Sequence, residues 1–261
     1  LTTLKKFNLK NITEELVDTF FLAGKLAQEI SKQGVKITIK SDKTPVTDGD
    51  IKVNTILCEK ISKLTSDIPI VSEETVNLNK KNENKTFWLI DPIDGTKDYI
   101  KKKDEYTLNA CLIINLEPVI GVVYAPAKDR MFFSYGKGTA FEIHNGIKKA
   151  LNCKKLNESE IIGLTNSDKT PNEILNIYKK YKVTKTIKMS SSIKFCLIAS
   201  GEADIYAAQP RAFEWDIAAG HAILDHAGGS VTDFNEKKFL YGKSDYRNTA
   251  IIAKRSTNIE R

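Results

Sequence analysis

A strongly apolar segment that runs directly into two aspartates constrains this chain more than any other feature of its sequence. Residues 87–96 read FWLIDPIDGT. Pro92 fixes its own φ angle and biases Asp91 toward an extended backbone, so Asp91 and Asp94 can project from the end of a buried strand. Carboxylates held in this way suit a hard cation such as Mg²⁺. Taken alone, the segment is equally consistent with a strand that ends in an ordinary turn.

The composition describes a globular chain of 261 residues, 41% of them hydrophobic, which is enough for one large domain or two modest ones. No stretch approaches the ~20 apolar residues of a membrane span, so we expect no stable membrane insertion. Residues 1–16 lack a signal-peptide pattern. We expect a cytoplasmic protein, with peripheral attachment at the inner membrane left open. The cysteines are far apart and predict neither a zinc site nor disulfides: Cys58, Cys111, Cys153 and Cys196.

The net charge of +7 raises the question of an anionic partner. Lysines are scattered along the chain, and no basic stripe alternates with aromatic residues, so the pattern favours a solvated surface over a nucleic-acid interface. One lysine run, at residues 101–103, directly follows the aspartate-rich segment and could attract an anionic small molecule. We therefore expect a small-molecule partner and no nucleic acid.

Apolar spacing predicts helices and short strands in the first hundred residues and an antiparallel meander after them, at residues 105–147. Beyond residue 150, strands and helices alternate, which indicates a different arrangement. A soft boundary therefore divides the chain into an α+β half, residues 1–150, and an α/β half, residues 151–261. Outside the meander we expect helices at 12–33, 50–64, 171–181 and 190–201 and strands at 35–40 and 68–74.

Acidic residues lie at the ends or beginnings of several predicted elements and could converge. Each has a commoner interpretation by itself, a helix cap or a solvated side chain. Several carboxylates in one pocket would repel one another without cations, so their convergence would predict divalent metal ions. The residues concerned are Asp48, Glu73, Glu74, Asp91, Asp94 and Asp216.

Two motifs carry a family resemblance. DPIDGT at 91–96 and EWDIAAGHAILDHAGG at 214–229 resemble the two signatures of the inositol monophosphatase superfamily, whose members are Mg²⁺-dependent and typically lithium-sensitive phosphomonoesterases. The motifs occur in the family's order and spacing, and the resemblance covers nearly the whole chain. It implies an α+β fold, the layered α/β/α/β/α sandwich shared with fructose-1,6-bisphosphatases, and two or three Mg²⁺ ions.

The same resemblance implies a set of metal ligands. Glu73, Asp91 and the backbone carbonyl of Ile93 would bind one ion. Asp91, Asp94 and Asp216 would bind a second. Ions about 3.5–4 Å apart would clamp the phosphate and activate a bound water, and no covalent phosphoenzyme is required.

The resemblance also implies catalytic and substrate-binding roles. Glu73 and Thr96 would orient the attacking water, and Asp48 would accept a hydrogen bond from the Thr96 hydroxyl. The choice of Glu73 over Glu74 rests on the resemblance alone. The implied substrate contacts are Ile93, Asp94, Gly95, Thr96, Ser190, Lys194, Glu214 and Asp216.

The segments DGTKDYI, E-Y-T and SSSIKFCLIASGEADIY resemble those of bacterial CysQ-type 3′(2′),5′-bisphosphate nucleotidases. This implies hydrolysis of adenosine 3′,5′-bisphosphate to AMP and phosphate, with nucleotide-side contacts from the second half. A helix that starts near Ser190 would favour an anion, and Lys194 could pair with the phosphate that is not cleaved. Relatives often carry an arginine soon after Tyr206, a place that Arg211 could fill here.

Two other functions remain open at this point. An inositol monophosphatase or a broad sugar-phosphate phosphatase would use the same metal site. A non-catalytic metal-binding protein is disfavoured, because it would have no physical need for a costly carboxylate cluster. Both monomers and homodimers occur in the family, so the oligomeric state stays undecided. His221 and His226 are five residues apart and are expected to be structural or surface residues rather than paired ligands.

Overall fold

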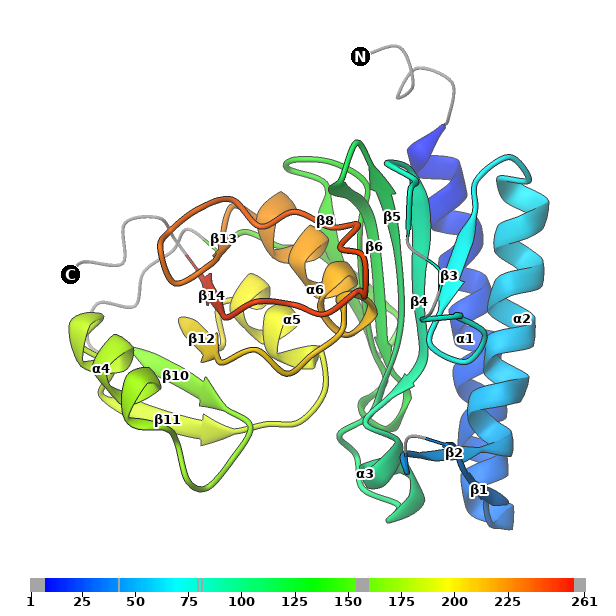
Figure 1. Ribbon diagram of the computed structural model, residues 1–261, viewed down its shortest axis with the longest axis horizontal. Coiled ribbons are helices and arrows are strands. Elements are labelled where there is room, and N and C mark those ends of the chain that lie inside the picture. Colours follow the sequence, from blue (N-terminus) through cyan, green and yellow to red (C-terminus); the bar gives the residue numbers. More distant parts are fainter. Residues whose placement is uncertain (1–7, 42, 79, 81, 154–159, 256–261) are drawn as a thin grey trace.

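The computed structural model describes residues 8–41, 43–78, 80, 82–153 and 160–255. Helices and two large sheets alternate in layers across the molecule (Figure 1). Helices α1 and α2 form one outer layer, α5 and α6 lie between the sheets, and α4 covers the far side. The expected α+β sandwich with five α/β/α/β/α layers is confirmed.

The helices are α1 (Leu9–Gln33), α2 (Asp48–Leu64), α3 (Thr96–Ile100), α4 (Asn172–Lys180), α5 (Ile193–Ser200) and α6 (Glu214–His226), with a 3₁₀ turn η2 (Pro126–Lys128). The first strands are β1 (Ile37–Ile39), β2 (Pro45–Thr47), β3 (Ile70–Ser72), β4 (Phe87–Asp94), β5 (Thr107–Ile114), β6 (Glu117–Ala125) and β7 (Arg130–Ser134). The remaining strands are β8 (Ala140–His144), β9 (Ile147–Ala150), β10 (Ile162–Thr165), β11 (Lys185–Lys188), β12 (Ile205–Ala208), β13 (Ser230–Thr232) and β14 (Ile251–Lys254).

The large sheet contains β3 to β9 in sequence order. β3 and β4 are parallel, and every later neighbour pairs antiparallel, so the predicted meander is confirmed. Both residues of the β5–β6 turn, Asn115 and Leu116, have positive φ, as tight hairpin turns require. Strand β4 is buried along most of its length and ends at the aspartates of the DPID segment.

Helix α2 begins at Asp48 because Thr47 and Asp50 form a capping box. The Thr47 side chain accepts from the backbone N–H groups of Gly49 and Asp50, and an Asp50 carboxylate oxygen accepts from the Thr47 backbone N–H. The helix therefore starts two residues earlier than the predicted 50–64. This cap fixes Asp50 at the end of the helix that lies toward the DPID segment.

Helix α6 packs closely on the large sheet. A Cβ at Gly121 of β6 would collide with the carbonyl oxygen of Ala219 in α6, so only glycine permits this approach. Leu224 and Ala222 of α6 share one apolar core with Phe132 of the large sheet. The close contact fixes the position of the α6 N-terminus relative to the sheet.

The small sheet has the order β11-β10-β12-β14-β13. Strands β10, β11 and β12 run parallel, and β14 joins antiparallel to its two neighbours. The proposed division near residue 150 falls between the last strand of the large sheet and the first of the small one, with residues 154–159 outside the described chain. Both halves nevertheless contribute to one apolar core, which includes Phe87 and Ile251.

No helix among the described residues combines the length and the apolar character that crossing a bilayer requires. None of the four cysteines, all of which lie in the described part of the chain, forms a disulfide, and three of them are buried: Cys111, Cys153 and Cys196. Burial raises the pKa of the Cys111 thiol well above its usual value, which makes it an inert core residue rather than a nucleophile.

Candidate active site

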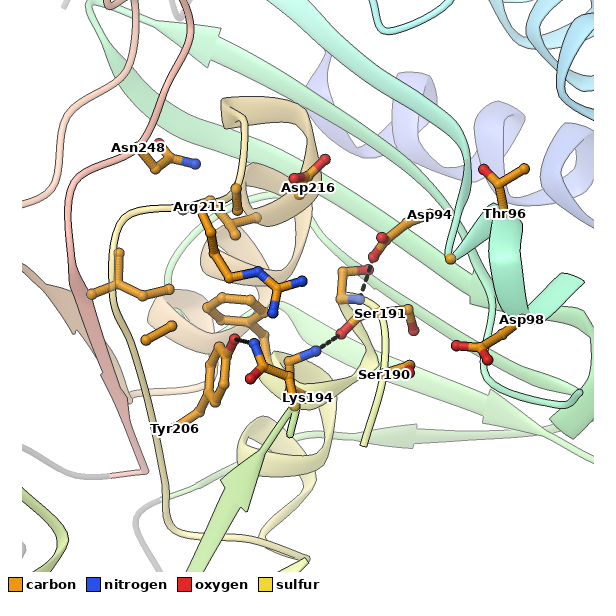
Figure 2. Close-up of a pocket in the computed structure, with 18 of the residues that line it drawn as sticks. Asp94, Thr96, Asp98, Ser190, Ser191, Lys194, Tyr206, Arg211, Asp216 and Asn248 are labelled. Carbon is orange, nitrogen blue, oxygen red and sulfur yellow. Dashed lines mark hydrogen bonds between the residues drawn. The ribbon is translucent and has the colours of Figure 1, made fainter. Parts of the chain in front are cut away.

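A cleft of about 360 Å³ opens where the end of β4 meets the N-terminal ends of α5 and α6. Its lining is acidic on one side and basic on the other (Figure 2). Glu73, Asp94 and Asp216 belong to the acidic side, and Lys194 and Arg211 belong to the basic side. Figure 2 shows Arg211 and Lys194 directed into the space that Asp94 and Asp216 face from the other side.

Three separate segments bring a compact group of carboxylates together. Glu73 follows β3, Asp91 lies in β4, and Asp216 lies in the first turn of α6. One carboxylate oxygen of each lies within 4.8 Å of the others. Asp216 keeps its place because its Oδ2 accepts from the backbone N–H of Phe213 at 2.8 Å. Three of the four predicted carboxylate ligands therefore converge directly.

The carboxylates of this group have too little positive charge around them to neutralise them. Asp91 is 1% exposed, and its Oδ1 has no hydrogen-bond partner among the described residues. Burial, together with Glu73, Asp94 and Asp216, raises the pKa of Asp91 well above its usual value. The pKa of Asp216 is raised in the same direction by burial and by Asp94. An orphaned oxygen among hard oxygen donors fits a bound divalent cation such as Mg²⁺.

Asp94 and Ile93 lie at the edge of this group. The Oδ2 of Asp94 accepts from the backbone N–H of Ser192 at 2.5 Å. The carbonyl oxygen of Ile93 accepts from the Thr96 hydroxyl at 3.2 Å, although Ile93 itself is buried. Gly95 has a φ of +94° and lies so near the Glu105 carbonyl that a Cβ would approach it to 3.0 Å. The strand therefore turns sharply enough to present Asp94 and Thr96 on the same cleft.

The structure separates Glu73 from Glu74. Glu74 is nearly buried and pairs with Lys40 at 2.8 Å, whereas Lys40 is 3.9 Å from Glu73. Glu73 lines the cleft and belongs to the carboxylate group. Loss of solvent and the neighbouring carboxylates raise the pKa of Glu73 to about 7, although Lys40 opposes the shift. Of the two residues, Glu73 thus belongs to the carboxylate group, while Glu74 holds Lys40.

The expected hydrogen bond between Asp48 and Thr96 is wrong. The Thr96 hydroxyl lies 3.3 Å from Oδ1 of Asp50, and Asp48 instead accepts from the backbone N–H of Lys36 at 2.9 Å. Asp50 is buried, and desolvation raises its pKa to about 6 although Thr47 opposes the shift. The capping-box spacing of Thr47 and Asp50 in the sequence was the signal that could have identified Asp50.

The expected contact between Glu214 and substrate gains no support, because Glu214 is not among the residues that line the cleft. Glu214 is fully buried, and its carboxylate accepts from the backbone N–H groups of Gly242 at 2.9 Å and Lys243 at 3.0 Å. The Lys243 ammonium lies 3.0 Å from the same carboxylate. Glu214 therefore anchors the 240–248 loop and does not line the cleft.

The basic side centres on Lys194, which is only 6% exposed. Its Nζ donates to the Ser191 carbonyl and lies 5.1 Å from the centre of the Tyr206 ring. Burial lowers the pKa of Lys194 to about 8, and Asp94 opposes the shift. Helix α5 begins at Ile193 rather than near Ser190, so Ser190 belongs to the segment that precedes the helix. Ser190 still lines the cleft.

The histidines of α6 take no part in this site. His221 is buried with its Nδ1 2.8 Å from the Tyr241 hydroxyl, and His226 is buried with its Nδ1 2.9 Å from the Ser134 hydroxyl. Burial lowers the pKa of His221 to about 3 and that of His226 to about 4. Both are neutral core residues, and the expectation of a structural role is confirmed.

The sequence pattern of the inositol monophosphatase family matches residues 8–260, which is nearly the whole chain. This match agrees with the layered fold and the carboxylate group, and together they define the class of protein. The chain belongs to the inositol monophosphatase family, and the resemblance seen in its two motifs is confirmed.

Individual members of the family that are similar to this chain include nucleotidases and an inositol monophosphatase. A 3′(2′),5′-bisphosphate nucleotidase CysQ from Buchnera aphidicola subsp. Acyrthosiphon pisum is 39% identical over 216 residues, which are 82% of this chain and 80% of the relative. The crystal structure of CysQ from Bacteroides thetaiotaomicron superposes with a TM-score of 0.76 at 28% identity and covers 95% of this chain and 98% of that one. An inositol monophosphatase from Anabaena (Nostoc) sp. PCC 7120 has the same fold, with a TM-score of 0.76 at 21% identity over 97% of this chain and 94% of that one.

Proposed function

We propose that this protein is a Mg²⁺-dependent phosphatase that removes the 3′-phosphate of adenosine 3′,5′-bisphosphate and releases AMP and phosphate. The observation that carries the proposal is the division of one cleft into a carboxylate side and a cationic side. A bisphosphate needs two anion sites, one with metal ions for the reacting phosphate and one for the phosphate that stays. The names of the CysQ relatives support the same substrate class.

The residues present fit a metal centre of the family type. Glu73, Asp91 and the Ile93 carbonyl would hold one ion, and Asp91, Asp94 and Asp216 would hold a second. Bound Mg²⁺ would neutralise the phosphate and lower the pKa of a water molecule. The buried, unpartnered Oδ1 of Asp91 supports its place as a ligand shared by both ions.

Thr96 and Asp50 would guide the attacking water. The Thr96 hydroxyl has one proton and two acceptors within reach, Asp50 Oδ1 and the Ile93 carbonyl. When the proton points to Asp50, the Thr96 oxygen can accept a proton from water. The pKa of Asp50, raised to about 6, suits a group that takes up this proton through Thr96 near neutral pH.

The cationic side would orient the substrate. Lys194 is held by the Ser191 carbonyl and the Tyr206 ring, so its ammonium has little freedom to leave the cleft. Arg211 extends into the same space from the chain that follows β12. Both cations would pair with the 5′-phosphate, and Ser190 would contact the substrate beside them. The 3′-phosphate would then lie against the carboxylates.

The test is phosphate release in the presence of Mg²⁺ from adenosine 3′,5′-bisphosphate, AMP and inositol 1-phosphate at equal concentrations. We expect kcat/KM for the bisphosphate to exceed that for inositol 1-phosphate by ~100-fold, about 2.7 kcal/mol of transition-state discrimination. AMP, which has no 3′-phosphate, is the matched control and should release nothing. A preference for inositol 1-phosphate would be consistent with the proposed metal site and would contradict the proposed substrate.

A further inference from the structure

Alternate residues leading into β5 form a polar face that the proposed chemistry does not use. Glu105, Thr107 and Asn109 are two positions apart, so their side chains share one side of the chain. The residues between them, Tyr106 and Leu108, belong to the apolar core under α1 and α2. We call Glu105, Thr107 and Asn109 the β5 polar face.

Every residue of the β5 polar face contacts the serine segment, residues 190–192. Glu105 Oε2 accepts from the backbone N–H of Ser190 at 2.8 Å. The Ser192 hydroxyl lies 2.6 Å from Oδ1 of Asn109 and 2.8 Å from the Thr107 hydroxyl. Because Asn109 Oδ1 can only accept, Ser192 spends its one proton there and Thr107 must be the donor to Ser192. The contacts therefore hold the serine segment at both ends.

The residue between these ends is strained. Ser191 has a φ of +52°, a left-handed conformation that residues other than glycine seldom adopt. Such conformations persist where the surrounding structure holds them in place. The strained residue also presents its carbonyl oxygen to the Lys194 ammonium. Contacts from the β5 polar face thus maintain a conformation that orients a cation in the cleft.

The same segment reaches the carboxylate side. The backbone N–H of Ser192 donates to Asp94 Oδ2 at 2.5 Å, and Asp94 lines the cleft. In the sheet, Asp94 is the direct partner of Thr107, and Asp91 is the direct partner of Asn109. A displacement of Ser192 would therefore change the position of a proposed metal ligand and of Lys194 together.

We propose that Thr107 is a positioning residue, whose hydroxyl holds the serine segment so that Asp94 and Lys194 keep their places on opposite sides of the cleft. The proposal rests on the proposed function. Thr107 is fully buried and its hydroxyl contacts Ser192, through which it would act. It also gives a physical reason for the E-Y-T-L-N spacing at residues 105–109.

A matched pair of variants tests this role. Thr107→Val keeps the volume and removes the hydroxyl, whereas Thr107→Ser keeps the hydroxyl and removes a methyl group. We expect Thr107→Val to lower kcat at least about 10-fold, since small misplacements at a reacting centre are costly. We expect it to weaken Mg²⁺ binding, measured by calorimetry without substrate, at least about threefold. Thr107→Ser should stay within about twofold of wild type in both.

A purely structural role would lower the free energy of unfolding of the variants and leave kcat and Mg²⁺ affinity of the folded protein unchanged in both. Equal kcat and Mg²⁺ affinity in the two variants would overturn the proposal. An inactive wild type would contradict the proposed function, and the Mg²⁺ titration would still decide the role of Thr107. If Thr107→Val does not fold, Glu105→Leu against Glu105→Gln tests the same clamp at Ser190, where only leucine removes the acceptor.

Discussion

Two carboxylates in the first turn of α6 lie in opposite environments although they are only two residues apart. Glu214 is fully buried against the 240–248 loop, where two backbone N–H groups and Lys243 satisfy it. Asp216 points into the cleft beside Glu73 and Asp91, and its pKa is raised well above the usual value by burial and by Asp94. Glu214 stabilises the fold, whereas Asp216 is repelled by the carboxylates beside it.

This contrast shows how a buried acid reveals its use. A carboxylate that the protein has paired is part of the scaffold, and its removal should cost stability. A carboxylate left among other carboxylates is held for a ligand that brings positive charge, and its removal should cost function. Removing a carboxylate of each kind should therefore give opposite results.

The strongest test removes the charge at the centre of the carboxylate group. Asp91→Asn should lower kcat by at least about 1,000-fold, or about 4 kcal/mol, because the remaining side chains cannot hold both ions. The metal-free protein should melt at the same temperature or higher, since repulsion is relieved. Phosphate release and thermal unfolding in a chelator measure the two effects. Near-normal turnover in excess Mg²⁺ would contradict the ligand assignment.

The opposite result is expected at Glu214. Glu214→Gln should lower the free energy of unfolding by about 3 kcal/mol, because Lys243 loses its buried partner. The Mg²⁺ affinity of the folded fraction should remain that of the wild type, because Glu214 does not line the cleft. Denaturant unfolding and calorimetry of the same sample give both values. A large loss of Mg²⁺ binding with unchanged stability would reverse the contrast.

The pair Asp50 and Asp48 repeats the comparison at the start of α2. Asp50→Asn should lower kcat about 10- to 100-fold, since the Thr96 hydroxyl would lose its carboxylate partner. Asp48→Asn is the matched control and should change kcat less than about twofold, because Asp48 accepts from the Lys36 backbone N–H and not from Thr96. Equal losses in the two variants would mean that Thr96 has another partner during turnover.

The smallest effect concerns buried groups that remain neutral. His221 and His226 have pKa values of about 3 and about 4 in the folded protein, below the usual value near 6.5. Between these limits the unfolded chain binds more protons, so the free energy of unfolding should fall as pH falls, by about 1.4 kcal/mol per pH unit for each histidine. Above pH 6.5 this dependence should vanish.

Unfolding curves from pH 7 to 5 for His226→Gln and wild type isolate the contribution of one histidine. The variant should lose about half of the histidine-dependent slope. His144→Gln is the control, because His144 is exposed. A slope in His226→Gln equal to that of wild type would show that His226 is already protonated in the folded state.

The sequence predicted those features that depend on local pattern. Apolar spacing located helices α1, α2, α4 and α5 and the meander, and the DPID segment identified the strand end that carries Asp91 and Asp94. Family and layered fold followed from two motifs and are confirmed. Metal binding by the acidic residues stays a prediction, although the structure brings three of them within 4.8 Å.

The departures from the expected positions share one physical cause, which is side-chain direction. Residues two apart on a helix point to nearly opposite sides, so Glu214 and Asp216 cannot both face the cleft. The same holds for Asp48 and Asp50 at the start of α2. Asp48 accepts from a backbone N–H, and Asp50, two residues later, is the one that contacts the Thr96 hydroxyl. Sequence spacing gives this relation, but which member faces the site depends on how the helix packs.

The close packing at Gly121 determines how wide the cleft is. Ala219, which rests against Gly121, is one helical turn from Asp216, so the thickness of a single glycine sets the gap between a carboxylate on the helix and those on the sheet. The separation of the carboxylates is therefore set by a helix–sheet contact that lies outside the cleft. A methyl group added at Gly121 would change the distances between the carboxylates without contacting any of the proposed ligands.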